Sequence, residues 1–342
     1  MAHVLRHSAV ATAYLFALSI GSAHAQEKQV ELRIAHWMPA QHAVSKLTIE
    51  PWAKSVEAAS KGTIKPVLFP AQQMGKAADH YDMARDGIAD LTFVSPGYQA
   101  GRFPIFSATE LPLLIGKSAP ASEAIDAWYR KYATAEMKDV KLCFAHLHLG
   151  VLHAKRAITE PSQLKGMRIR SSSGTTAQTM VLLGATNVQV PAPEARDALD
   201  KGVADALTFP WTTLTTFNID KSVKFHTDIP IYAGTFVWAM NKRWYDGLGA
   251  MQKKVIDDHC SNEWASKAGA PYAEWEDEGR EKLEKAGGHT IVKLTAAQVA
   301  VWKKAVEPIE AAWAKDAAKS GADPKVVLDS LKQELGARKA LY

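Results

Sequence analysis

The sequence predicts an α/β fold divided into two lobes, and three observations indicate it. Between residues 30 and 97, short apolar runs alternate with helical patterns, which is typical of a mainly parallel sheet. A segment near residue 90 is echoed near residue 205, which indicates two similar units. A helical stretch beyond residue 249 is long enough to bridge the two units.

The first unit reads strand, helix, strand, helix, strand. Ile49, Trp52 and Val56 form an apolar stripe on the first helix. Gly62 then ends that helix, because glycine tolerates the turn conformation. The expected elements are strands over 32–36, 63–69 and 90–94, and helices over 45–59 and 77–85.

The middle and the end of the chain continue differently. The middle keeps the alternation, with strands expected over 142–148, 167–171, 188–190 and 236–240, an extended run over 151–157, and helices over 175–183 and 193–202. Helices are expected over 249–285, 295–318 and 324–335. Pro271 bends the first of these because proline removes one backbone hydrogen bond. Thr295 and Asp323 are expected N-caps.

The internal echo compares Gly87-Ile-Ala-Asp90-Leu-Thr-Phe with Gly202-Val-Ala-Asp205-Ala-Leu-Thr-Phe. In both, a helix stops at a glycine in the left-handed position, and an aspartate leads into a strand and a proline-marked loop. Ligands of open α/β sheets bind at the carboxyl ends of strands. The echo therefore predicts two lobes that face each other across a crevice, with a chance match as the alternative.

The first 25 residues predict a signal peptide. Arg6 gives a weakly basic start, residues 8–19 are largely apolar, and Ala23-His24-Ala25 is a small-x-small cleavage site. The mature chain is expected to begin near Gln26, in the periplasm. Its 317 residues (342 minus 25) suggest two domains.

Composition excludes several classes of protein. No later run approaches the roughly eighteen apolar residues of a membrane span, so the mature chain is not expected to be embedded in a membrane. Net charge falls from +5 to +4 when the leader, with one Arg and no acid, is removed. Basic and acidic residues are mixed along the chain, which argues against nucleic acid as a partner. Cys143 and Cys260 are expected either to pair or to be two buried free thiols.

The stretch from Gln163 to Ser173 is the candidate ligand-binding segment. A turn at Gly166 precedes a strand in which Arg168 and Arg170 share one face, and Ser172 lies in the small-residue loop that follows. A planar guanidinium grips a carboxylate with two parallel hydrogen bonds. The alternative is two solvated arginines on an exposed sheet face.

Familiar catalytic and cofactor signatures are absent from the sequence. It contains no His-Glu-x-x-His zinc helix, no Gly-x-Ser-x-Gly elbow, no phosphate loop and no Gly-x-Gly-x-x-Gly. His36, His42, His80, His146 and His148 lack a carboxylate at ligand spacing, so neither a metal nor a cofactor is expected. His148 ends a strand and is expected to line the crevice.

Six segments together resemble the periplasmic solute-binding subunits of TRAP transporters, of the DctP type. They are Phe69-Pro-Ala-Gln-Gln-Met-Gly75, Asp86-Gly-Ile-Ala-Asp90, Gln163-Leu-Lys-Gly-Met-Arg-Ile-Arg170, Leu183-Gly-Ala-Thr-Asn187, Pro193-Glu194 through Ala198-Leu-Asp-Lys-Gly-Val-Ala-Asp205, and Asn241-Lys-Arg-Trp244. The resemblance covers nearly the whole mature chain. It implies a two-lobed periplasmic binding protein fold with a hinge, in which Arg170 forms the principal ion pair with a ligand carboxylate. Arg168 then faces solvent.

One departure from the family pattern bears on the ligand. Where the family often has Gly-Gln-Glu-Asn-Pro, this chain has Ala206-Leu-Thr-Phe-Pro210, so Phe209 replaces a polar Asn and Trp211 follows. Trp37 and Trp238 are further candidate ring contacts. Aromatic faces near a cation suit a carboxylate with an apolar or aromatic body, whereas packing between the lobes is the alternative role of these rings.

The sequence thus predicts a binding protein, not an enzyme, that closes over an organic acid and delivers it to TRAP permease subunits in the membrane. An aromatic or apolar monocarboxylate is the expected ligand, with a C4-type dicarboxylate or small 2-oxo acid as the alternative. Lobe I is expected over 26–147 plus about 236–275, and lobe II over 148–235 plus about 276–342. The expected ligand-binding residues are Arg170, Phe209, Trp211, Trp37, His148, Trp238, Ser95 and Ser172.

Two other functions remain open at this point. A secreted hydrolase or lyase would use His148 with an acid such as Glu194, but the sequence offers no nucleophile beside them. A ligand sensor for a membrane receptor would share the fold and differ only in its partner.

Overall fold

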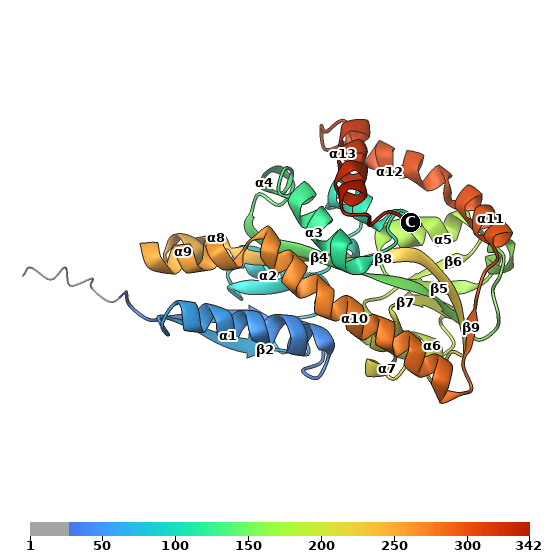
Figure 1. The fold of residues 1–342 in the computed structure, drawn as a ribbon, viewed down its shortest axis with the longest axis horizontal. Coiled ribbons are helices and arrows are strands. Elements are labelled where there is room, and N and C mark those ends of the chain that lie inside the picture. Colours follow the sequence, from blue (N-terminus) through green and yellow to red (C-terminus); the bar gives the residue numbers. More distant parts are fainter. Residues whose placement is uncertain (1–26) are drawn as a thin grey trace, which may run out of the picture.

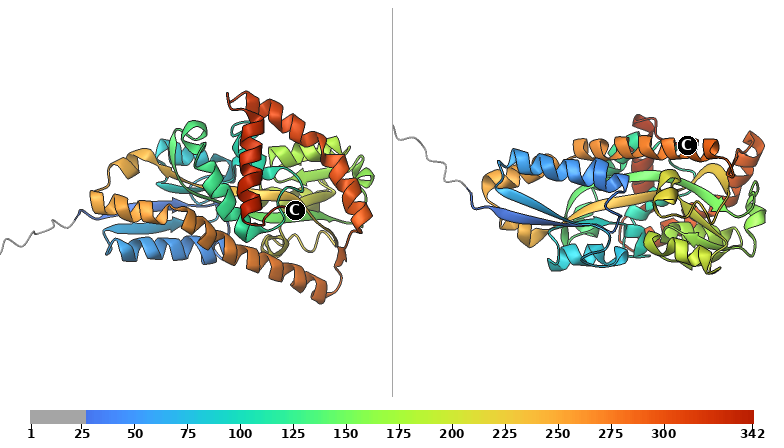
Figure 2. Two further views of the ribbon diagram at one scale, coloured as in Figure 1. Left: turned by 45° about the horizontal axis from the view of Figure 1, so that its top comes forward. Right: turned by 90° about the horizontal axis from the view of Figure 1, so that it is seen from below.

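A computed structural model describes residues 27–342, and the predicted signal peptide lies outside them. This part of the chain forms one nine-stranded sheet in the order β2-β1-β3-β8-β4-β7-β5-β6, with β9 beside β8. Helices cover both faces of the sheet (Figures 1 and 2). The predicted α/β fold class is therefore confirmed.

The strands are β1 Val30–Ala35, β2 Ile64–Phe69, β3 Leu91–Val94, β4 Val140–Ala154, β5 Arg168–Ser171, β6 Thr186–Gln189, β7 Ala206–Phe209, β8 Phe225–Asn241 and β9 Thr290–Val292. The helices are α1 Glu50–Ala59, α2 His80–Asp86, α3 Ser118–Tyr129, α4 Ala133–Glu136, α5 Gly174–Leu182, α6 Ala195–Asp200, α7 Trp211–Thr216, α8 Lys242–Asp246, α9 Ala250–His259, α10 Asn262–Ala286, α11 Ala296–Val306, α12 Pro308–Ala318 and α13 Pro324–Ala337.

Two halves of the sheet make the two lobes. The first lobe holds β1, β2 and β3 with α1 and α2, and the second holds β5, β6 and β7 with α5 and α6. The long strands β4 and β8 pair antiparallel between the halves. Helix α10 runs along both, since it contacts α7 in the second lobe and the turn before α1 in the first (Figure 1). It is the long bridging helix that the sequence predicted.

The lobe boundaries expected near residues 148, 236 and 276 stay a proposal. Each falls inside an unbroken element, respectively β4, β8 and α10. The chain therefore passes between the lobes through two paired strands and one helix.

The two lobes repeat one structural detail that the sequence echo indicated. In the first lobe, the carboxylate of Asp90 accepts hydrogen bonds from the backbone N–H and the guanidinium of Arg33 on β1. In the second, the carboxylate of Asp205 binds the backbone N–H and the guanidinium of Arg168 on β5 in the same way. Each aspartate fixes the register between two parallel strands, so the echo reflects a shared unit.

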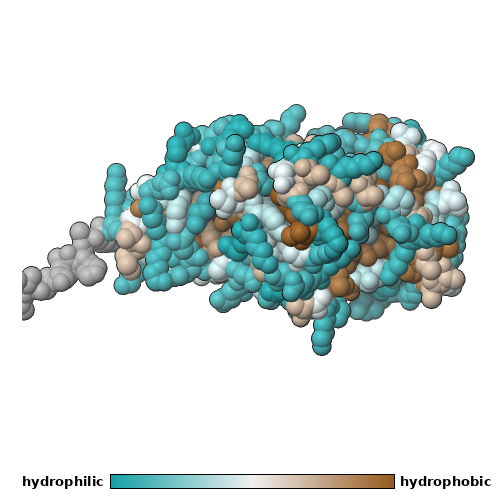
Figure 3. Space-filling view, turned by 90° about the horizontal axis from the view of Figure 1, so that it is seen from above, coloured by the Kyte–Doolittle hydropathy of each residue, from teal (hydrophilic) through white to brown (hydrophobic). Residues whose placement is uncertain are grey.

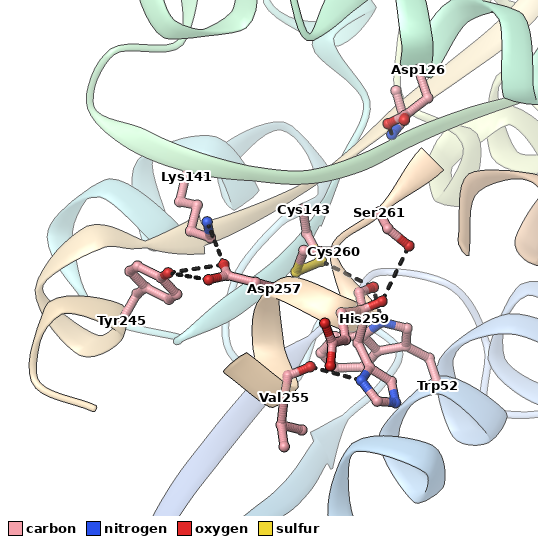
Figure 4. The surroundings of a disulfide bond; sticks show 12 residues. Trp52, Asp126, Lys141, Cys143, Tyr245, Val255, Asp257, His259, Cys260 and Ser261 are labelled. Carbon is pink, nitrogen blue, oxygen red and sulfur yellow. Dashed lines mark hydrogen bonds and ion pairs between the residues drawn. A yellow bond between two sulfur atoms is a disulfide. The ribbon is translucent and has the colours of Figure 1, made fainter. Parts of the chain in front are cut away.

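The predicted helix over residues 249–285 is wrong as a single element. It divides into α9 and α10, because Cys260 leaves the helical conformation and Ser261 is extended. Cys260 is bonded to Cys143 on β4, and this disulfide ties the junction of the two helices to the sheet (Figure 4). Beside it, the indole N–H of Trp52 donates to the carbonyl of His259. Of the two states that the sequence allowed for Cys143 and Cys260, the structure therefore shows the disulfide.

Other boundaries shift for local reasons. The helix expected over 295–318 divides at Pro308, which starts α12. β8 begins eleven residues before the predicted 236, at Phe225. Thr295 and Asp323 cap α11 and α13 as predicted, each accepting a backbone N–H from the first turn.

Candidate functional site

A small cavity lies where the lobes meet, at the carboxyl ends of β3, β5 and β7. Its volume is about 30 Å³, room for two or three water molecules at roughly 10–15 Å³ each. An organic acid therefore fits only when the lobes part or the lining side chains shift. The lining residues are Trp37, Met38, Ser95, Tyr98, His148, Arg170, Ser172, Ala192, Phe209, Pro210, Thr213, Tyr232, Gly234 and Phe236.

A much larger groove, of about 650 Å³, lies elsewhere, between α12, α13 and residues 111–114. It belongs to the face on which apolar side chains gather between polar ones (Figure 3). Its charged residues include Glu310 and Lys332, which pair with each other. Size does not identify the ligand site here, because the groove offers no buried charge for a ligand to neutralise.

Arg170 is the charged centre of the cavity. It lies on β5 between β6 and β7, and only 1% of the residue is exposed. Its Nε donates to the carbonyl of Val190 at 2.9 Å and Nη1 to that of Thr208 at 3.2 Å, whereas Nη2 is buried without a partner. No Asp or Glu carboxylate within residues 27–342 forms an ion pair with it. Burying an uncompensated charge is costly, so a bound anion would stabilise this arrangement.

Aromatic rings surround the cation. The Phe209 ring centre lies 5.4 Å from the guanidinium carbon of Arg170, within cation–π range. Across the cavity, the Trp37 ring packs on Tyr98 and Phe236, and its indole N–H is satisfied by the carbonyl of Phe93 at 3.0 Å. The cavity therefore joins one charged group to flat apolar surfaces, as aromatic carboxylates require.

Polar side chains complete the lining. The Ser172 backbone N–H donates to Thr208 Oγ1 at 3.1 Å, which holds the loop after β5. Ser95 is buried at the end of β3. His148 is buried among aromatic rings, and this burial lowers its pKa to about 3, so the imidazole is neutral.

The lobes also touch directly beside the cavity. Tyr98 follows β3 in the first lobe, and its hydroxyl oxygen accepts a hydrogen bond from the backbone N–H of Ala192 in the second lobe at 3.0 Å. His42, ahead of α1, lies 2.8 Å from Thr213 on α7, measured between Nε2 and Oγ1. Both contacts join a residue of the first lobe to a residue of the second.

The structure brings six of the eight expected binding residues to this cavity, and the other two lie elsewhere. Trp238 is on the same face of β8 as Phe236 but two residues further along, where its ring packs on Trp52 and Phe93 in the core. Trp211 starts α7 and turns toward His153. Neither ring lines this cavity, because each strand or helix carries its ring past the rim, and a ligand contact for these two residues stays a prediction.

Four lining residues with aromatic rings or hydroxyl groups are not among those expected from the sequence: Tyr98, Thr213, Tyr232 and Phe236. Tyr98 follows the Ser95 loop at a strand end, a position that the carboxyl-end rule could have selected. Tyr232 alternates with Phe236 on β8, but the predicted strand began too late to show this alternation.

Residues 27–342 contain neither a metal-ligand cluster nor a helix suited to cross a membrane. Within residues 27–342, no group of three or more His, Cys, Asp or Glu side chains converges on a common point. His153, His226 and His289 instead form a line, with nitrogen separations of 2.7 and 3.0 Å, in which His226 uses one ring nitrogen for each neighbour. No helix in the same part of the chain combines the length and hydropathy that a bilayer crossing requires.

A family model described as bacterial extracellular solute-binding protein, family 7 (DctP), matches residues 34–316. The chain belongs to this family. The resemblance drawn from the sequence motifs is therefore confirmed, and the cavity described above lies in a family 7 solute-binding protein of the TRAP type.

Solved structures of the family are similar over almost their whole length. A TRAP solute-binding protein from Rhodoferax ferrireducens T118, in complex with copurified benzoate, is 29% identical, with a TM-score of 0.87 over 91% of this chain and 99% of that one. A marine metagenome TRAP protein specific for aromatic acid ligands, with 3-hydroxybenzoate, is 31% identical, with a TM-score of 0.86 and the same coverage.

A curated relative is more distant. It is a solute-binding protein of Albidiferax ferrireducens, 23% identical over 55% of this chain. The match spans 58% of that family member, less than two thirds of its length.

Proposed function

We propose that this chain is the extracytoplasmic subunit of a TRAP transporter that captures an aromatic monocarboxylate and delivers it to permease subunits in the membrane. Arg170 binds the carboxylate through Nη2, and Phe209, Trp37 and Phe236 enclose the ring. One observation carries the proposal: a buried guanidinium with an unpaired N–H group stands in a cavity walled by aromatic rings. The similar proteins with benzoate and 3-hydroxybenzoate support it.

Binding of this kind is linked to lobe closure. The carboxylate contacts β5 in the second lobe, while Trp37 and Tyr98 belong to the first lobe, so the ligand stabilises the state in which both are within reach. Micromolar affinity corresponds to about 8 kcal/mol. One charge-assisted ion pair supplies about 1.5–3 kcal/mol, so burial of the ring must supply much of the remainder.

A C4-type dicarboxylate is the weaker candidate because it needs a second cation. Of the residues that line the cavity, only Arg170 is charged, and His148 is neutral. The cations considered from the sequence lie elsewhere: Arg102 pairs with Asp82, and Lys155 and Arg156 are exposed. A second carboxylate would be buried without a partner.

Catalysis has no support from the geometry. Glu194, the acid considered beside His148, is exposed and does not line the cavity. The lining contains no carboxylate and no Cys, so His148 has neither an acid to orient it nor a thiol nucleophile to activate.

A ligand panel tests the proposal. The mature chain, unfolded and refolded to remove bound ligand, is screened by thermal shift and then by isothermal titration calorimetry. The panel holds benzoate, phenylacetate, mandelate, succinate, malate and pyruvate. Aromatic acids are expected to raise Tm and to bind at micromolar Kd or tighter. Stabilisation by succinate or malate alone would overturn the aromatic assignment.

A further inference from the structure

Two glycines shape the floor of the cavity, where β4 and β8 pair. His148 on β4 lies opposite Gly234 on β8, and Gly150 on β4 lies opposite Tyr232 on β8. The two pairs are two residues apart and so face the same side of the sheet. Each glycine therefore receives a ring from the opposite strand.

Neither ring would fit over a larger residue. A Cβ added at Gly234 would lie 2.4 Å from Cε1 of His148, and one added at Gly150 would lie 2.0 Å from Cε1 of Tyr232. Both distances are far below van der Waals contact. Each ring therefore crosses directly over a glycine of the opposite strand, at the cavity floor, in space that a larger residue at that glycine would occupy.

The His148 ring keeps an unused hydrogen-bonding group. Only 4% of the residue is exposed, its Nδ1 has no partner, and its ring packs edge-on against Tyr272 and Tyr232. A neutral imidazole offers one donor and one acceptor. A buried group of this kind is costly to leave unpaired, so it is a natural partner for a polar group of the ligand.

An unpaired histidine in the core does not by itself indicate a ligand, as His146 shows. It lies two residues earlier on β4, is completely buried, and has both ring nitrogens without partners. However, its ring lies between Phe93 and Phe236, and it does not line the cavity. His148 differs from His146 in lining the cavity, not in lacking a hydrogen-bond partner. His146 therefore serves as a matched control for a buried histidine outside the cavity.

We propose that His148 determines specificity by hydrogen bonding to a hydroxyl group of the ligand, so that the preferred ligand is a hydroxylated aromatic monocarboxylate. The inference rests on the proposed function, because Arg170 must first orient the carboxylate. With the carboxylate at Arg170 and the ring between Phe209 and Phe236, His148 meets a hydroxyl on the ring or on the carbon that bears the carboxylate. Tyr232 closes the same floor.

The test measures Kd by calorimetry for two ligand pairs that differ by one hydroxyl: benzoate with 3-hydroxybenzoate, and phenylacetate with mandelate. In the wild-type chain, the hydroxylated member of at least one pair is expected to bind at least 10-fold more tightly. His148→Phe is expected to reduce that ratio to below 3. His148→Gln, which keeps one donor and one acceptor, is expected to retain more of the ratio than His148→Phe, and it serves as the second variant if His148→Phe does not fold.

The control and the contrary outcomes are distinct. His146→Phe is expected to leave the ratio unchanged. Equal binding within both pairs, an unchanged ratio in His148→Phe, or an equal loss of the ratio in His146→Phe would overturn this inference while the proposed function stands. Failure of all four acids to bind the wild-type chain would overturn the proposed function, and this inference with it.

Discussion

Arg168 and Arg170 lie two residues apart on β5, yet only Arg168 has a carboxylate partner among residues 27–342. Its guanidinium binds Asp205 at 2.6 Å, and 48% of its side chain is exposed. Arg170 is almost completely buried and binds two backbone carbonyls instead. The same strand thus carries one arginine that fixes the sheet and one whose charge has no carboxylate partner within residues 27–342.

This difference predicts opposite effects for two matched substitutions. Arg170→Gln removes the charge that binds the carboxylate, and we expect affinity for an aromatic acid to fall at least 30-fold, equivalent to about 2 kcal/mol or more. Arg168→Gln is expected to change Kd less than 3-fold, because its charge meets Asp205 in partial contact with solvent. Calorimetry on both variants decides. An equal loss of affinity in the two variants would show that the ligand responds to the overall positive charge and not to Arg170 in particular.

Closure of the lobes provides a second prediction. Tyr98→Phe removes the hydroxyl that accepts the Ala192 N–H across the cavity. A net hydrogen bond contributes about 0.5–1.5 kcal/mol, so the closed state becomes less favourable and affinity should fall about 2- to 10-fold. In small-angle scattering without ligand, the Tyr98→Phe variant is expected to have a larger radius of gyration than the wild-type chain. Tyr132→Phe, whose hydroxyl contacts Ser330 away from the cavity, is the control and should leave both measurements unchanged.

Sequence patterns predicted the strands that carry the site because local periodicity determines which residues are buried. The period-two alternation around Arg170 depends only on neighbours in the chain. The position of Asp205, the aspartate of the echo, depends on one parallel strand pair, β5 with β7. Tyr232 and Gly150 could not be connected in this way. Their contact depends on the register of β4 against β8, which joins residues 82 positions apart and has two irregularities.

The same limit applies to Trp238 and to Cys260. An aromatic residue on a pocket-side strand has the same sequence pattern whether it lies at the rim or in the core, and only the length of β8 places Trp238 in the core. Two cysteines 117 residues apart carry no sequence information on their distance in space.

The disulfide provides a third prediction, on stability. Cys143–Cys260 closes a loop of 117 residues, and loop entropy assigns such a bond about 5 kcal/mol at most. The double variant Cys143→Ala, Cys260→Ala is expected to lower Tm by about 10 °C in calorimetry. Ligand Kd should change less than 3-fold, because neither cysteine lines the cavity. Reduction of the wild-type chain is the matched treatment, and an unchanged Tm after complete reduction would contradict the prediction.

Buried histidines predict how stability depends on pH. Burial lowers the pKa of seven histidines to between about 2 and about 4, whereas in the unfolded chain they titrate near 6.5. Between these values the unfolded state binds more protons, so the free energy of unfolding falls as pH falls below about 6.5. These residues are His36, His42, His80, His146, His148, His153 and His226.

Two buried carboxyl groups oppose this trend. Burial raises the pKa of Glu110 and of Glu276 to about 7, above the 4.5 of the unfolded chain, so between these values their folded forms hold the additional proton. Acidification through this range therefore favours the folded state at these two positions. Seven histidines outweigh two glutamates, since each buried group contributes at most about 1.4 kcal/mol per pH unit.

We therefore expect Tm to fall by about 5–10 °C between pH 7.5 and pH 5.5, as followed by calorimetry in buffers of equal ionic strength. His146→Phe removes one contributing imidazole from a site that lies outside the cavity, so its loss of Tm over the same interval should be smaller than that of the wild-type chain. A Tm that rises on acidification would mean that Glu110 and Glu276 dominate. In that case Glu276→Gln, which cannot titrate, should reduce the rise. Its amide oxygen can still accept the Thr212 backbone N–H, and its NH2 group can donate to Thr213 Oγ1 in place of the lost acceptor.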